Sequence, residues 1–187
     1  HQVAVSLDGQ GPGRVVEAGT AAVPRQQTVV SDTGEVTRRL GAQPFGLVDT
    51  PRSQAAYGWL GSAGKVALTD LELEVSNPFA AVAASSLTDE PIGRSPRLLV
   101  TVVARAENTG LAYNATRTRL QARGAAPILA EPVRGALVLK VPPGRWRLQP
   151  LGADGSVLRE MAVTATEAGL RLELDTAPTI YYLLERQ

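Results

Sequence analysis

An almost unbroken apolar run lies in the middle of residues 96–110, and this stretch predicts the central strand of a sheet. Residues 98–104 are all apolar except Thr101. Side chains of an extended chain alternate between two faces, so both faces of this strand are apolar. Such a strand is covered on both faces, or lies at the centre of a sheet under another layer. We predict a strand over residues 97–107 that is ended by turn chemistry in Glu107-Asn108-Thr109-Gly110, because Asn and Gly tolerate positive φ.

Shorter apolar or alternating runs recur along the chain and are separated by turn residues. In residues 71–75, leucine and valine alternate with two glutamates, which is typical of a strand with one face in water. Asp8-Gly9 and Asp32-Thr33-Gly34 predict tight turns. The other predicted strands cover residues 3–7, 14–18, 27–31, 35–40, 47–48, 55–60, 79–87, 128–132, 136–141, 145–151, 156–164, 169–174 and 179–184. This rhythm, without a helical period over three turns, predicts an all-β fold: a two-layer antiparallel β-sandwich of jelly-roll or immunoglobulin-like type.

The length of 187 residues suits one domain with a substantial hydrophobic core. The last third of the chain has the regular spacing of a meander, which leaves a subdivision near Ala125 open. No low-complexity linker marks such a boundary, and we therefore predict a single domain over residues 1–187.

The composition of the chain excludes or disfavours several kinds of functional site. The chain has no cysteine, which excludes thiolate zinc sites, a cysteine nucleophile and a disulfide framework. A net charge of +1, with scattered basic residues, disfavours nucleic-acid binding, because such binding needs a basic patch. No run of about 18 apolar residues predicts a membrane span.

The single histidine is residue 1. A Ser-His-Asp triad needs an imidazole inside the fold, so classical serine hydrolysis is disfavoured. A terminal histidine with a second histidine would be the ligand set of a copper oxygenase, but the second is lacking. A chain that opens at His1, without the pattern of a signal peptide, is expected to be a fragment of a larger protein.

Acidic residues in or beside predicted turns are the remaining catalytic candidates. Asp49, Asp89, Glu90 and Glu107 could meet across a strand end as a carboxylate pair, as in glycosidases. Solvated or turn-capping roles are the alternative for each of them. Together with loop carbonyls, such acids could also hold a structural calcium ion, although no dense calcium-loop spacing is present, and the metal site stays unassigned.

Aromatic residues are few, and three are candidates for binding sugar. Tyr57 and Trp59 have the same parity on one predicted strand, so both rings point to the same side. Sugars stack their C–H surfaces on such rings, and the pair is the best predicted platform. The alternative is that both rings belong to the core, as we predict for Trp146. Tyr113, in a weakly patterned stretch, is expected to be exposed and is the third carbohydrate-binding candidate.

Several stretches together resemble a known family. They are Ser31-Asp32-Thr33-Gly34-Glu35-Val36, residues 48–55 continuing to Gly58-Trp59-Leu60, residues 79–87, residues 95–110 and Ile180-Tyr181-Tyr182. The combination is similar to the C-terminal β-sandwich region of large secreted bacterial glycoside hydrolases, where it follows a (β/α)₈ catalytic barrel. The resemblance covers most of residues 28–187.

The resemblance implies a secreted, non-catalytic ancillary domain, with a polysaccharide and the catalytic domain of the same parent chain as partners. No catalytic residue is carried over, because the catalytic carboxylates of the family lie in the barrel. The family often has an aromatic residue after the Asp-Thr-Gly-Glu turn, where this chain has Arg38-Arg39. Two hypotheses follow: a carbohydrate-binding module, or a structural interaction domain that packs on the barrel without binding glycan.

Overall fold

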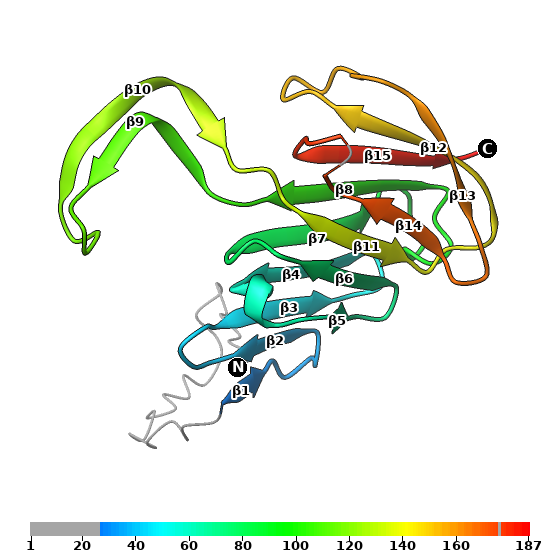
Figure 1. The fold of residues 1–187 in the computed structure, drawn as a ribbon. Coiled ribbons are helices and arrows are strands. Elements are labelled where there is room, and N and C mark those ends of the chain that lie inside the picture. The colour runs from blue at the N-terminus through cyan, green and yellow to red at the C-terminus, as the bar shows by residue number, and fades with distance from the viewer. Residues whose placement is uncertain (1–26, 176) are drawn as a thin grey trace, which may run out of the picture.

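The computed structural model describes residues 27–175 and 177–187, so the strands expected at 3–7 and 14–18 lie outside the described residues. The larger of its sheets has nine antiparallel strands in the order β1-β2-β3-β4-β7-β8-β15-β12-β13 (Figure 1). Its members are β1 (Thr28–Val30), β2 (Val36–Arg39), β3 (Phe45–Asp49), β4 (Ser53–Gly58), β7 (Ala80–Ser86), β8 (Arg97–Val103), β15 (Tyr181–Arg186), β12 (Gly144–Leu151) and β13 (Met161–Ala165).

A smaller four-stranded sheet packs on one face of the larger sheet, in the order β14-β11-β6-β5. Its strands are β5 (Val66–Ala67), β6 (Leu71–Val75), β11 (Gly135–Leu139) and β14 (Leu170–Glu173). A single 3₁₀ turn, η1 (Leu60–Ser62), follows β4. The fold is therefore the predicted all-β, two-layer antiparallel sandwich.

The core lies between the two sheets and is built from aliphatic side chains at alternate strand positions. In β6, Leu71, Leu73 and Val75 are buried while the glutamates between them face outward, as the sequence predicts. The inward residues of β8 meet them from the opposite sheet, and Trp146 on β12 is fully buried, also as predicted.

Of the two arrangements expected for the central strand, the structure shows the second: β8 lies inside the nine-stranded sheet with the small sheet over one of its faces. Its inner side chains, such as Val100, are buried, but Leu99 and Thr101 on the outer face are half-buried and Val103 is 40% exposed. The strand is interior to its sheet, between β7 and β15, and no described strand covers its outer face. Alternation revealed two apolar faces without revealing what lies over each.

Buried polar side chains tie the two sheets together. Gln54 of β4 is fully buried; its amide oxygen accepts the backbone N–H of Asp70 at 2.8 Å, and its amide nitrogen donates to the Asp70 carboxylate at 3.3 Å. Tyr182 of β15 donates its hydroxyl to the carbonyl oxygens of Leu174 and Ala177. Buried polar groups are costly without partners, so these pairs also fix how the sheets are aligned.

A long two-stranded arm leaves the sandwich after β8. It consists of β9 (Ala106–Tyr113) and β10 (Leu120–Ala130), and it projects from the body and curves over along its length (Figure 1). The predicted single strand over residues 97–107 is thus two strands, and Glu107-Asn108-Thr109-Gly110 lies within β9 instead of forming a turn. The strand expected at 128–132 is the end of β10.

The side chains of Asn108 and Thr109 donate hydrogen bonds to the backbone of the bulged strand β10. The pairing register shifts between Ala125 and Ile128, and the Thr109 hydroxyl donates to the Pro127 carbonyl oxygen at 2.7 Å. The Asn108 amide donates to the carbonyl of residue 123. A bulge leaves backbone groups unpaired, and these side chains supply the missing donors.

Most other predicted strands are confirmed within one to three residues at each end, including the hairpin of β1 and β2 around Gly34. The strand predicted over 156–164 is wrong in its first half, because β13 begins at Met161 and only a single bridge joins Val157 to Leu151. Among the described residues, no helix is long and apolar enough to cross a membrane.

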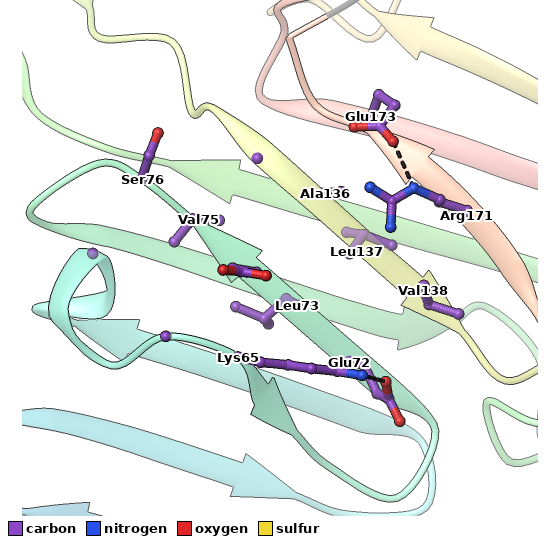
Figure 2. A pocket seen from close by; sticks show the side chains of 14 residues that line it. Lys65, Glu72, Leu73, Val75, Ser76, Ala136, Leu137, Val138, Arg171 and Glu173 are labelled. Carbon is purple, nitrogen blue, oxygen red and sulfur yellow. Dashed lines mark hydrogen bonds and ion pairs between the residues drawn. The ribbon is translucent and has the colours of Figure 1, made fainter.

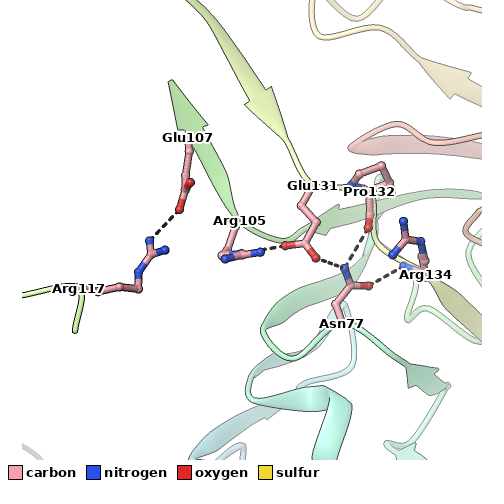
Figure 3. A network of polar contacts seen from close by, with 7 residues as sticks. All are labelled: Asn77, Arg105, Glu107, Arg117, Glu131, Pro132 and Arg134. Carbon is pink, nitrogen blue, oxygen red and sulfur yellow. Dashed lines mark hydrogen bonds and ion pairs between the residues drawn. The ribbon is translucent and has the colours of Figure 1, made fainter. Parts of the chain in front are cut away.

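A polar network fixes the root of the arm to the body (Figure 3). Arg105 donates to a carboxylate oxygen of Glu131 at 3.0 Å, which joins the start of the arm to its end. The buried Asn77 donates to the other Glu131 oxygen at 3.1 Å and accepts the backbone N–H of Arg134 at 2.7 Å. The hydrogen bond from Arg105, more than that from Asn77, lowers the pKa of Glu131.

We predict that acid loosens the root of the arm. A carboxyl group with a lowered folded-state pKa contributes stability above its unfolded pKa, about 4.3 for glutamate, and this stability is lost as the pH falls through the folded value. NMR relaxation should therefore show that the backbone amides of β9 and β10 become more mobile below about pH 4. The mobility of the β8 amides should not change. Glu131→Gln should show the same mobility at neutral pH. Unchanged arm mobility in both tests would contradict the role of this network.

Candidate functional site

Three part-exposed aromatic residues lie at the end of β4 and just before β7. Tyr57 is 37% exposed, Trp59 39% and Phe79 46%. The β4–β7 ladder pairs Gly58 with Ala80, so Trp59 and Phe79 are the next opposed positions. Their ring centroids are 6.1 Å apart and their planes nearly perpendicular, an edge-to-face contact. The two predicted residues therefore do not belong to the core, and a third ring joins them.

Tyr57 lies against the sheet because its neighbour has no side chain. Gly46 is the cross-strand partner of Tyr57, and a Cβ atom on Gly46 would overlap the phenol end of the ring. The missing Cβ lets the ring settle on the backbone of β3 and leaves its other side toward solvent. On the neighbouring β3 residue Phe45, the Arg39 guanidinium stands 5.3 Å from the ring centroid, a cation–π contact.

Backbone geometry turns Trp59 out of the strand. Gly58 has φ +117°, and a Cβ there would meet the Pro44 carbonyl oxygen at 2.6 Å, so only glycine fits. The Trp59 N–H donates to the same Pro44 oxygen at 3.0 Å, and its carbonyl accepts the Ser62 hydroxyl. The η1 turn is thereby fixed against the end of β4.

A cleft of about 500 Å³ lies on the outer face of the small sheet (Figure 2). Small residues, Gly135 and Ala136 of β11 among them, form part of its lining, and charged side chains stand around them. Lys65 pairs with Glu72 at 2.6 Å, and Arg171 pairs with Glu173 at 2.6 Å.

Most charges in this cleft are neutralised by a neighbour. Lys140 also reaches Glu72, at 3.3 Å, and hydrogen bonds from Lys65 and then Lys140 lower the pKa of that carboxyl group. Glu74 is the one carboxylate of the cleft lining with no ion-pair partner among the described residues. Paired charges of this kind offer donors and acceptors to hydroxyl groups without attracting a strongly charged ligand.

The aromatic group and the cleft share two chain segments. Gly61 and Ser76 line the cleft, and Trp59 and Phe79 stand two residues before and three residues after them. These segments touch, because a Cβ on Gly61 would meet the Asn77 carbonyl oxygen at 2.6 Å. Trp59 and Phe79 are thus near one end of the cleft along the chain, but none of the three rings lines it, and Tyr57 faces outward from the opposite, nine-stranded sheet.

Tyr113 does not join this site. It lies at the outer end of β9 on the arm, where it is 38% exposed, as expected. The Arg117 guanidinium lies 4.8 Å from its ring centroid and occupies one face. Of the three predicted sugar-binding residues, Tyr57 and Trp59 are both part-exposed at the end of β4, and Tyr113 lies apart on the arm.

The acidic candidates are occupied separately and do not form a carboxylate pair. Asp49 accepts the backbone N–H and hydroxyl of Thr69, at 3.1 and 3.0 Å. Asp89, Glu90 and Glu107 are each paired with a different arginine. Over residues 27–175 and 177–187, no group of three or more His, Asp or Glu side chains is placed to hold a metal ion, and His1 lies outside these ranges.

Phe79 was not among the predicted site residues. Pro78 precedes it, and its run reads as a buried strand, so composition gave no reason to place the ring at the surface. Only the register of β4 on β7 reveals that it opposes Trp59.

Comparison of the chain with protein-family models, with curated proteins and with solved structures finds no match.

Gly46→Ala tests the position of the Tyr57 ring. The added methyl group overlaps the far end of one side chain, so we expect the ring to swing away at a cost of about 1 kcal/mol or less in unfolding free energy. Contacts in nuclear Overhauser spectra between residue 46 and the Tyr57 ring should disappear, while the denaturation midpoint changes little. A variant that keeps these contacts would show that the ring does not rest on Gly46.

Proposed function

We propose that the chain is a non-catalytic carbohydrate-binding module of a secreted polysaccharide-degrading glycoside hydrolase. The observation that carries the proposal is the set of open rings around the end of β4 and the start of β7: Tyr57, and the contacting pair Trp59 and Phe79. Sugar rings bind proteins through C–H faces on aromatic surfaces and through hydroxyl groups on planar polar side chains. The likeness of several sequence stretches to the ancillary region of such hydrolases supports the same proposal.

Charge in the cleft favours a neutral glycan. The pairs Lys65–Glu72 and Arg171–Glu173 leave little net charge on its walls. A polyanion would meet the unpaired Glu74, whereas hydroxyl groups can donate to that carboxylate. The cleft also lies along an open sheet surface, so it can receive the interior of a chain as well as its end.

A second candidate function is an interaction domain that packs on the catalytic barrel of the same parent chain without holding sugar. It is favoured by the outer face of the nine-stranded sheet, where Leu99, Leu183 and Tyr181 are half-buried and Val103 is exposed. An apolar sheet face with no described cover is a surface on which another domain could pack. Under this alternative, the isolated chain does not bind any glycan.

Calorimetric titration with soluble glucans, xylans and mannans tests the proposal. We expect one of these polymers to bind, and Trp59→Ala or Tyr57→Ala to weaken its binding by about twofold to tenfold, since a lost aromatic contact costs about 0.5–1.5 kcal/mol. Tyr113→Ala is the matched control: the ring has the same exposure but lies on the arm, and its loss should leave affinity unchanged.

The outcomes separate the two functions. If no polymer in the panel binds, carbohydrate binding fails and the interaction domain remains. If a polymer binds equally well to the Trp59→Ala and Tyr57→Ala variants, the aromatic group is not the binding surface.

A further inference from the structure

We propose that the β9–β10 arm docks onto a protein partner whose contact surface combines carboxylates with an apolar area. This proposal does not depend on glycan binding, because the arm carries none of Tyr57, Trp59 and Phe79. It concerns a separate surface, and it follows from the exposure, order and charge of the arm.

The arm carries large apolar side chains that are exposed to solvent. Every residue of β10 is exposed, with Ile128 at 69% and Leu129 and Leu120 also open to solvent. A two-stranded hairpin with little buried surface is marginal in water by itself. Large apolar side chains left exposed on a projecting element are candidates for an interaction site.

The tip of the arm is held in one shape by its own side chains. The Asn114 amide donates to the hydroxyls of Thr116 and Thr118, and its oxygen accepts the backbone N–H groups of Thr118 and Arg119. Arg117 has φ +54°, an uncommon conformation for a residue other than glycine, which local contacts must hold.

Arg117 also links the tip of the arm to β9. Its guanidinium lies over the ring of Tyr113. It also pairs with Glu107 at 2.9 Å, ten residues back along the chain (Figure 3). Arg105, Glu131 and Asn77 fix the root to the sandwich. An element ordered before binding loses less conformational entropy when it meets a partner.

Charge defines the chemistry of that partner. Residues 106–130 contain three arginines and a single glutamate, and Arg117 already pairs with that glutamate. Arg119 and Arg123 are exposed and have no carboxylate partner within the described residues. A partner surface with carboxylates opposite these two residues is electrostatically complementary to the arm.

Two other occupants fit less well. A second copy that paired strand to strand would need a regular free edge, but two register shifts interrupt this hairpin, and bulges hinder edge pairing. Two like-charged arms would also repel each other. A polyanion would satisfy the arginines but would leave Ile128 and Leu129 uncovered.

The test uses the whole 187-residue chain and three synthetic peptides of equal length in calorimetric titrations. One alternates glutamate with leucine, one alternates glutamate with serine, and one alternates lysine with leucine. We expect the glutamate–leucine peptide to bind at least about tenfold more tightly than either of the others, because only it meets both the charge and the apolar groups.

Variants assign this binding to the arm. Arg119→Glu combined with Arg123→Glu should weaken the glutamate–leucine peptide by about tenfold or more, and Ile128→Ser should weaken it as well. The matched control, Arg38→Glu combined with Arg145→Glu, makes the same charge change at exposed positions of the sandwich and should alter affinity by no more than about twofold. Thermal unfolding should be the same for all variants, since none of these side chains is buried.

Three results would overturn the proposal. One is equal binding of the glutamate–leucine and glutamate–serine peptides, which would indicate a polyanion as the ligand. Another is loss of binding in the control variant, which would show a general charge effect. The third is a dimer in sedimentation velocity that Ile128→Ser dissociates, which would assign the arm to a second copy of this chain.

Discussion

Burial of aliphatic side chains between two antiparallel sheets is the constraint on which the rest of the structure depends. Leu71, Leu73 and Val75 point from β6 into the core that they share with Val100 and its neighbours on β8. Because strand side chains alternate, fixing the inner residues also fixes which residues face out. Each outer surface of this molecule is therefore a consequence of core packing.

The proposed glycan site shows this dependence. Ala56 is buried in the core, so Tyr57 must point outward, and Gly46 opposite it leaves room for the ring to lie on the sheet. On the small sheet, burial of the leucines in β6 places Glu72 and Glu74 in the cleft. The Gln54–Asp70 contact holds the sheets in register, so the rings and the cleft keep a fixed relation.

Much of the sandwich could be predicted from alternation and turn chemistry, because each is a local signal. The wet face of β6 and the Asp32-Thr33-Gly34 hairpin are examples. The arm could not, because residues 111–126 lack a clear period, and Asn108-Thr109-Gly110 has the composition of a turn. In the structure these side chains satisfy a bulge on a partner strand, which is a pairing that local sequence does not encode.

The candidate site was predictable in part for the same reason. Parity placed Tyr57 and Trp59 on one side of a strand, but the side itself depends on which strands neighbour β4. The position of Phe79 opposite Trp59 becomes evident only from the register of β4 on β7. Tyr113 lies apart from Tyr57 and Trp59 because it is on the arm, which projects from the sandwich.

The most direct test of the central claim uses the fluorescence of Trp59. The chain has two tryptophans, of which Trp146 is fully buried and Trp59 is 39% exposed, so Trp146→Phe leaves a single reporter on the proposed binding surface. The account predicts that acrylamide quenches this reporter in the free chain, and that a bound glycan shifts its emission to the blue and protects it from the quencher. Glycan binding that leaves the quenching of Trp59 unchanged would contradict the account.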